Sequence, residues 1–585
     1  MQEPLRAERH TSSEATRLLS AGAYLDRGFR RAVVGELIGN ANRPVAPSLG
    51  VDVLTVLAHA VRARSQEVLA ALGLLVVWVG FFLVEAEMTD SGSAYFSADA
   101  VTSSLDRFTS DPTSLAGLAP YWYATVCAAL LLARWFAGRR PVPYAPVERD
   151  QQESTLDVAR FFGRWRRRLG RFAILWAWIN MAAYWVAAFR SIKDDPFPVI
   201  FPVAMALVIW IHRTQVEGVL RDELGRDAFL DNPPAIGLPE TPRCRRVAEA
   251  IAREQHAHGA LYDAHLPFVG AGVPYQPWSF ALELKPDERA DGKASVPAQA
   301  GEEKHHELTA SRVVALVAEP LQRLRDAAAE HSVDRLRDLD IEEFVYLPAG
   351  VDRAAGFFPA HPGDDGIDQH IRSAVDEGGE GRRHFLRLRV GAWDEQVVVT
   401  VFVRIHTQGR MLVLEVAPHV LGPVREEFRD VDAVVGPLGP FDVVRGALKA
   451  LFLAPTAMFA LGWSAGRTVT EAARTVWEAP ERRAPGAPVK SVREMGGSGE
   501  LSLFQEMDVS RYVKTIQDRI ASGVRDALER SGYKTDRFEQ QIVNVNEGGL
   551  FIKDMSGGYA VGTVSGRAVA VGDNSRATGT AGEQG

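Results

Sequence analysis

The sequence predicts an α-helical membrane protein with about four transmembrane helices and a cytoplasmic α+β domain that contains an antiparallel β-meander. Apolar runs without Asp, Glu, Lys or Arg crowd the first third of the chain, and they predict the membrane helices. The charge of the loops between these runs alternates in sign, as expected when the loops lie on opposite sides of a bilayer. Short alternating apolar segments beyond residue 380 predict the meander.

The apolar runs are the first evidence for membrane insertion. Each approaches the ~20 helical residues that cross a bilayer, and a helix satisfies all its backbone polar groups internally. The runs are Val68–Val84, Leu115–Ala133, Phe172–Phe189 and Pro196–Ile211. The alternative is that they are buried helices of a large soluble protein, but this alternative leaves the alternating loop charge unexplained.

The loop charges predict the orientation. Positive residues are retained on the cytoplasmic side, so the arginine-rich loop from Arg134 to Arg171 is expected inside. The loop after the first run is acidic and is expected outside. Both chain ends and the segment His212 to Arg226 then face the cytoplasm of a multi-pass cell (inner) membrane protein.

Composition excludes two classes of protein. The net charge of −8 does not suit a general nucleic-acid binder, which usually carries a concentrated basic face, so no nucleic-acid partner is expected. Only 2 cysteines, Cys127 and Cys244, are present, so a disulfide framework is not expected.

The pattern along the chain predicts a series of segments around the membrane helices. The predicted organisation is a cytoplasmic helical N-terminal segment (1–66), a first transmembrane hairpin (67–137), a basic cytoplasmic loop (138–170), a second transmembrane hairpin (171–212), the α+β domain (213–440), an apolar helix (441–478), a Pro/Gly-rich linker (479–506), an amphipathic helix (507–532) and a Gly-rich β-type or flexible tail (533–585).

Within the α+β domain, a helix is predicted over Ala310 to Ala329. Three alternating runs, His384 to Val390, Gln396 to Ile405 and Met411 to Val416, predict the meander. The middle run is almost entirely β-branched, which is typical of a central strand.

Two later helices carry distinct predictions. Leu448 to Gly466 is apolar but contains a lysine and a proline, so an interfacial or docked helix is preferred to a further membrane crossing. Asp508 is the predicted N-cap and Gly532 the predicted stop of the amphipathic helix. A stripe of this kind more often packs on its own protein than on a partner, and assembly is the other interpretation. The residues of this candidate assembly stripe are Val509, Val513, Ile516, Ile520, Val524 and Leu528.

No catalytic, cofactor-binding or metal-binding residue is nominated. Gly462 to Gly466 match the G-x-S-x-G elbow of serine hydrolases, but no histidine follows the serine to act as its base. The histidines between His256 and His306 lack metal-ligand spacing. Cations of the basic loop are candidates for contact with lipid headgroups; these are Arg164, Arg166, Arg167 and Arg168.

Three passages resemble a family of uncharacterised actinobacterial, Streptomyces-like multipass membrane proteins. They are PFVGAG (267–272) followed by WSFALEL (278–284), FLRLRVGAWDEQVVVTVFVR (385–404), and the C-terminal helix with its Gly-rich tail. The resemblance extends from about residue 15 to residue 575. It implies a membrane-bound protein with a large cytoplasmic part and transfers no activity.

The expected function is non-enzymatic. The chain is interpreted as an integral membrane protein that anchors a cytoplasmic sensor or scaffold domain, with self-assembly through its C-terminus and an unknown cytoplasmic protein partner. One alternative is an oligomeric channel or pore. The other is a membrane-bound enzyme with an unidentified active site in residues 213–440.

Overall fold

The computed structural model describes the chain in part and divides it into two compact units. It describes residues 12–88, 102, 117–136, 159–231, 236–286, 308–331, 334–349, 366–375, 381–408, 410–434, 440–477 and 486–540. The first unit contains residues 1–42, 51–248 and 424–482, and the second contains residues 43–50, 249–423 and 483–585. The Gly-rich tail, most of the acidic loop and most of the basic loop lie outside the described residues.

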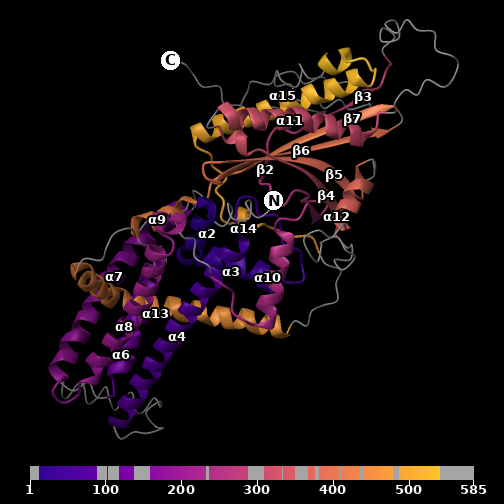
Figure 1. Ribbon diagram of the computed structural model, residues 1–585. Coiled ribbons are helices and arrows are strands. Elements are labelled where there is room, and N and C mark those ends of the chain that lie inside the picture. The colour runs from indigo at the N-terminus through magenta and orange to yellow at the C-terminus, as the bar shows by residue number, and fades with distance from the viewer. Residues whose placement is uncertain are drawn as a thin grey trace, which may run out of the picture. The chain divides into compact units, whose positions relative to one another are not determined.

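The first unit is helical (Figure 1). Its long helices are α4 (Val53–Met88), α6 (Ala119–Phe136), α7 (Ala159–Ser191), α8 (Phe197–Asp222) and α13 (Pro440–Trp477). Its shorter elements are α2 (Glu14–Leu25), α3 (Arg27–Val34), η1 (Gly35–Gly39), α9 (Arg226–Asp231), η5 (Glu426–Val434) and most of α10 (Pro242–Glu254).

Four of these helices are long and apolar enough to cross a membrane: Val53–Met88, Leu169–Ser191, Phe197–Asp222 and Val444–Thr470. Their number among the described residues equals the four membrane helices that the sequence predicts, but the set differs from the sequence prediction. The predicted second span corresponds to α6, which has 18 residues and includes Arg134 near its end, and it is not in this set. Its place is taken by α13, the predicted interfacial or docked helix.

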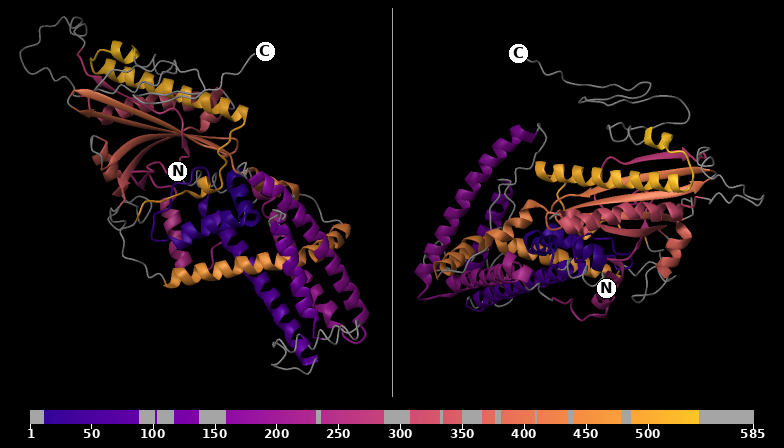
Figure 2. Two further views of the ribbon diagram at one scale, coloured as in Figure 1. Left: turned by 180° about the vertical axis from the view of Figure 1, so that it is seen from behind. Right: turned by 45° about the horizontal axis from the view of Figure 1, so that its top comes forward.

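Small and aromatic side chains make the core of these helices. Leu74 and Phe81 of α4 and Tyr123 of α6 lie in one cluster with residues of α7, α8 and α13. Ala450, Ala454, Ala457, Met458 and Leu461 are the α13 members of this cluster. Figures 1 and 2 show α13 crossing the other long helices obliquely instead of running along them.

The second unit is built on a seven-stranded sheet in the order β1-β4-β5-β6-β7-β2, with β3 also paired to β7. The strands are β1 (Gly259–Tyr262), β2 (Val273–Pro274), β3 (Trp278–Glu283), β4 (Asp340–Pro348), β5 (Arg383–Ala392), β6 (Val397–Gln408) and β7 (Met411–Leu421). The sheet is mixed, because β1 pairs with β4 in parallel while the other pairings are antiparallel. The predicted meander is therefore only the β5-β6-β7 part of a larger mixed sheet.

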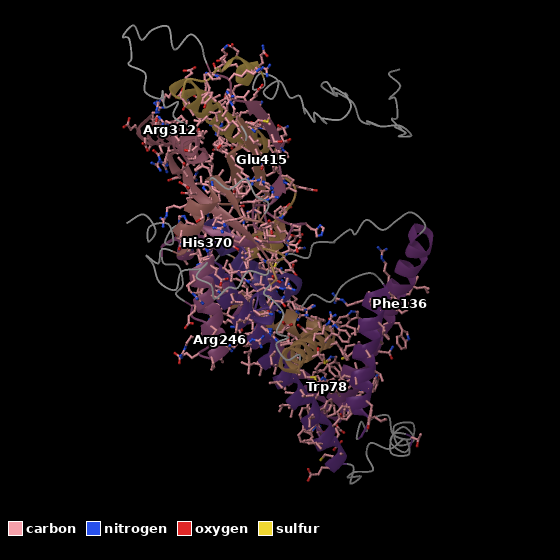
Figure 3. The ribbon with its side chains drawn as sticks, turned by 90° about the vertical axis from the view of Figure 1, so that its right-hand side faces the viewer. Trp78, Phe136, Arg246, Arg312, His370 and Glu415 are labelled. Carbon is pink, nitrogen blue, oxygen red and sulfur yellow. The ribbon has the colours of Figure 1, made fainter. Side chains whose placement is uncertain are left out.

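One face of this sheet is covered by α11 (Ala310–His331) and α15 (Leu503–Arg530), which lie side by side (Figure 2). Alternate residues of β5 and β6, such as Leu388 and Val401, enter the core beneath them. The remaining helices are α12 (Gly366–Ala374), α14 (Val492–Met495) and η4 (Arg335–Asp338). Figure 3 labels side chains from these elements, including His370 of α12, Arg312 of α11 and Glu415 of β7.

Two sequence predictions about α15 have different outcomes. The helix begins at Leu503 and its N-cap is Ser502, whose hydroxyl accepts from the amide of Gln505 in a capping box, so the prediction of Asp508 as the N-cap is wrong. The predicted stop is confirmed, because the helix ends at Arg530 and Gly532 adopts the left-handed conformation with φ 74°.

Candidate functional site

The sheet face opposite α11 and α15 concentrates buried charge. Register places Arg387 of β5 beside Glu342 of β4 and Arg389 beside Asp340. The guanidinium of Arg387 lies 2.5 Å from the Glu342 carboxylate, and that of Arg389 lies 2.7 Å from Asp340. Because each buried cation has a carboxylate partner on the next strand, the sheet can hold charge that would otherwise be costly to desolvate.

Arg387 is buried between an acid and an aromatic ring. Its guanidinium carbon stands 4.2 Å from the centre of the Phe344 ring, in cation–π geometry. Burial lowers the pKa of Arg387 to about 10, so the side chain remains cationic at neutral pH. This arginine is best explained as part of the internal packing of the sheet.

The turn between β5 and β6 is strained. Trp393, Asp394 and Glu395 have consecutive positive φ angles of 55°, 54° and 65°. For residues other than glycine the left-handed conformation costs roughly 1–2 kcal/mol each. Such strain persists only where the surroundings impose it, and it is concentrated at functional sites.

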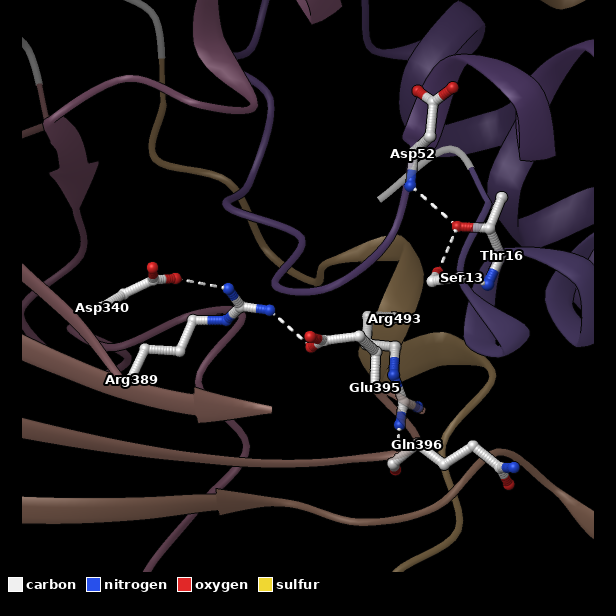
Figure 4. Close-up of polar contacts among 8 residues, drawn as sticks. All are labelled: Ser13, Thr16, Asp52, Asp340, Arg389, Glu395, Gln396 and Arg493. Carbon is white, nitrogen blue, oxygen red and sulfur yellow. Dashed lines mark hydrogen bonds and ion pairs between the residues drawn. The ribbon is translucent and has the colours of Figure 1, made fainter. Parts of the chain in front are cut away.

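Partners from distant segments hold this turn. The indole Nε1 of Trp393 donates to Asp508 Oδ2 of α15 at 3.2 Å, and Asp394 pairs with Arg335 at 2.8 Å. Glu395 pairs with Arg389 at 2.5 Å (Figure 4). The strained conformation is therefore fixed by three other elements of the second unit.

The carboxylate of Glu395 lies where two glycines leave room. A Cβ at Gly391 would stand 2.2 Å from the Glu395 carboxylate oxygens, and a Cβ at Gly50 would stand 2.5 Å from one of them. Gly50 also has φ 74°, which disfavours any side chain. The path of Glu395 toward Arg389 thus depends on glycine at both positions.

Arg493 of α14 is the most unusual side chain of this region. It is fully buried, and its Nη2 donates to the carbonyl oxygen of Gln396 at 2.5 Å (Figure 4) and to that of Gly422 at 2.7 Å. Its Nε and Nη1 have no hydrogen-bond partner among the described residues. Burial lowers the pKa of Arg493 to about 10, and the charge of Glu395 opposes this shift.

Local sequence explains how α14 forms. Ser491 accepts from the amide of Glu494, and Glu494 Oε2 accepts from the amide of Ser491, which completes a capping box. The other oxygen of Glu494 accepts from the amides of Gly270 and Gly272 at 2.8 and 3.2 Å. α14 is consequently tied to the PFVGAG loop, where Gly270 has φ 93°.

This loop covers the same sheet face with an aromatic side chain. Phe268 stacks on Phe402 with ring centres 4.6 Å apart and lies 4.8 Å from the ring of His419. Burial lowers the pKa of His419. The hydroxyl oxygen of Thr400, which lies between Arg389 and His419 across the strands, is buried without a partner among the described residues.

In the first unit, ion pairs and hydrogen bonds connect neighbouring helices and helix ends. Glu67 of α4 binds Arg27 at 2.5 Å and also Arg30. Ser13 and Thr16 share a hydroxyl hydrogen bond of 2.9 Å at the start of α2, and Thr16 accepts from the amide of Asp52 at 3.0 Å (Figure 4). The ion pairs of Glu67 join α4 to α3, the hydroxyls of Ser13 and Thr16 lie at the start of α2, and the geometry indicates no further chemistry for these groups.

The predicted site residues fall in different places. The candidate headgroup contacts Arg164, Arg166, Arg167 and Arg168 belong to α7, but their side chains lie outside the described ones. The six apolar residues of the candidate assembly helix are buried in the hydrophobic core that α15 shares with α11 and the sheet, at exposures of 2 % or less. The stripe therefore packs on its own protein, the alternative left open by the sequence.

Sequence reasoning missed Arg389, Glu395 and Arg493, which the fold brings together from β5, its turn and α14. The S-x-x-E pattern from Ser491 to Glu494 was a signal for α14. Among the described residues no group of three or more His, Cys, Asp or Glu side chains could hold a metal ion.

Comparison with known proteins gives one family. The family model described as an AbeC-like domain matches residues 277–563. This match covers β3 to α15 and so includes Arg389, Glu395 and Arg493. No curated protein and no solved structure matches the chain.

Proposed function

We propose that the chain is a multi-pass protein of the cell membrane that anchors the second unit in the cytoplasm as a sensor or scaffold domain. The observation that carries the proposal is the outer surface of the long helices. Only 22 % of the most apolar stretch of α4, and the same share of that of α7, is buried. Large apolar side chains are exposed instead, among them Val76 at 70 %, Phe172 at 71 % and Trp176 at 61 %.

Lipid accounts for this surface better than water does. A soluble monomer rarely exposes a contiguous apolar patch larger than about 300–600 Å². On these helices the exposed positions continue for several turns, whereas the small residues and tyrosines lie inside (Figure 3 labels Trp78 of α4 and Phe136 of α6). Such an arrangement is stable when hydrocarbon surrounds the helices.

The oblique course of α13 supports an interfacial position for this helix. One face contacts the other helices through Ala454 and Leu461. Phe452 and Trp463 are exposed at 59 % and 72 %, while Arg445, Lys449 and Arg467 supply charge along the helix. An amphipathic helix of this kind lies in the plane of a bilayer surface. With α4, α6, α7 and α8 crossing, both chain ends then face the cytoplasm.

A sensing role for the second unit is supported by the strained β5–β6 turn. Strain of this kind is typical of segments that change conformation when a ligand binds.

Cysteine labelling in intact cells tests the topology. Cys127 and Cys244 are replaced by alanine, and single cysteines are placed at Ser104, in the acidic loop outside the described residues, or at Lys514, an exposed position of α15. We expect a membrane-impermeant maleimide to label Ser104→Cys in intact cells and Lys514→Cys only after permeabilisation.

Two outcomes contradict parts of the proposal. Labelling of Lys514→Cys in intact cells means that α13 crosses the bilayer or that the orientation is reversed, and the result at Ser104 separates these cases. Release of the protein from membranes by an alkaline carbonate wash rules out integral insertion altogether.

A further inference from the structure

We propose that the side chain of Glu395 occupies an anion-binding site formed by Arg389, Arg493, Gly50 and Gly391, and that a ligand phosphate or carboxylate displaces it. We call these five residues the Glu395 site. The proposal rests on the sensing role given above to the second unit, for which it names the class of ligand. It does not depend on how many helices cross the membrane.

The charges of the site are the first evidence. Arg389 is 8 % exposed and binds two carboxylates, Asp340 at 2.7 Å and Glu395 at 2.5 Å. Arg493 is fully buried, its hydrogen bonds among the described residues go to backbone carbonyls, and the charge of Glu395 acts on it. When Glu395 leaves, two buried cations remain with one carboxylate, Asp340, and the vacated position attracts an anion.

Position in the fold, and not exposure, distinguishes the two carboxylates of Arg389. Glu395 is 27 % exposed and belongs to a turn, whereas Asp340 is 24 % exposed and belongs to a strand whose backbone is hydrogen-bonded to β5. Moving Glu395 requires only a change of turn conformation, while moving Asp340 disrupts the sheet. Glu395 is therefore the carboxylate that a ligand arriving from solvent can replace.

The glycines define the kind of group that the site accepts. With no Cβ at Gly50 or Gly391, the space beside Arg389 accommodates carboxylate oxygens at distances that a side chain would forbid. Arginine binds phosphate and carboxylate through the same fork of N–H donors. The unpartnered Nε and Nη1 of Arg493 are additional donors within the described region.

Strain gives the exchange a driving force. The three consecutive left-handed residues relax once Glu395 no longer has to reach Arg389, so ligand binding and turn release favour each other. The turn also carries Trp393 and Asp394, which contact Asp508 and Arg335. Displacement of Glu395 is thereby transmitted to the start of α15 and to η4.

Titration of the full-length protein in detergent with inorganic phosphate tests the proposal, with chloride at matched ionic strength as the reference. Binding is followed by calorimetry, and turn release by hydrogen exchange of the peptide covering residues 391–397. We expect saturable phosphate binding together with faster exchange in this peptide. Absence of binding by both the wild type and Glu395→Gln overturns the proposal.

Variants separate a ligand site from a structural ion pair. Glu395→Gln removes the competing charge, and we expect phosphate to bind about tenfold more tightly, as when an ion pair of modest strength no longer competes. Glu500→Gln changes an exposed glutamate of the same unit and should leave the affinity unchanged. An affinity of Glu395→Gln equal to that of the wild type contradicts the displacement.

A second variant leaves both arginines intact. Asp394→Gly relieves strain in the turn conformation in which Glu395 binds Arg389, and it removes only an exposed ion pair. Because this conformation is then favoured over the one that binds the ligand, we expect phosphate binding to weaken by about fivefold. A purely structural turn would become more stable with no change in affinity, and that result also overturns the proposal.

The phosphate can come from solution or from a lipid. Nanodiscs that contain phosphatidic acid, compared with nanodiscs of phosphatidylcholine alone, distinguish the two sources. Faster exchange of residues 391–397 in the phosphatidic acid discs without added phosphate assigns the site to a lipid headgroup. An unchanged exchange rate there, with a response to free phosphate, assigns it to a soluble anion.

Discussion

Substitution of Gly523 by alanine tests whether α15 belongs to the core of its own chain. A Cβ at this position would stand 2.6 Å from Val317 Cα of α11 and 3.1 Å from the carbonyl oxygen of Leu316. The first atom is backbone, so the two helices must move apart to admit the methyl group.

Two opposing effects decide the result. Alanine is favoured over glycine in a helix interior by about 1 kcal/mol. Overpacking a well-packed core costs about 1–3 kcal/mol, and contact with backbone belongs at the upper end of this range. We therefore expect a net loss of about 1–2 kcal/mol in the local stability of the α11–α15 pair.

Hydrogen exchange of α11 and α15 peptides in the full-length protein measures this loss, because it reports local opening free energy. Asp518→Ala is the matched control: it lies on the same helix, is exposed, and gains helix propensity without a new contact. The expected result is faster exchange in both helices for Gly523→Ala and no such change for the control. Equal or slower exchange, or a change in oligomer size without a change in exchange, would refute the packing of α15 on α11.

Three further predictions address other regions. Burial raises the pKa of Asp195, so the folded state favours the protonated form of this side chain. The free energy of unfolding therefore falls as the pH rises above the ordinary aspartate pKa of about 3.9, and Asp195→Asn should flatten the fall of melting temperature with pH in this range. Gly50→Ala should lower the melting temperature by several degrees, because φ is 74° and the methyl group meets Glu395, and an unchanged value would contradict this geometry. Leu75→Arg, at a position of α4 that is 57 % exposed, should cost about 2.5–3.5 kcal/mol of insertion free energy in a glycosylation-based insertion assay, whereas full insertion would argue against lipid at this face.

Regular periodicity made part of the fold predictable. β5, β6 and β7 were found because their apolar residues alternate, and α11 was found from its helical spacing. β4 was missed because Asp340 and Glu342 interrupt its apolar pattern. These acids are partly buried and pair with Arg389 and Arg387 of the neighbouring strand.

The candidate site could not be predicted for a related reason. The left-handed turn contains Trp393, Asp394 and Glu395 instead of the glycine or asparagine that usually mark such a conformation. Arg493 lies in a stretch that the sequence predicts as a Pro/Gly-rich linker, and its burial depends on carbonyl groups of Gln396 and Gly422 far away in the chain. Local patterns carry no information about such pairings.

The segment 43–50 has a consequence for biosynthesis. It is translated before the apolar helices, yet the amide of Val45 donates to Glu254 at 2.7 Å, and the carbonyl of Pro47 lies where a Cβ on Gly270 would be. α15, which belongs to the same unit, is translated after all the long apolar helices. The second unit consequently cannot reach its native state until translation of every intervening helix is finished, and a nascent chain stalled after α8 should leave residues 43–50 accessible to protease.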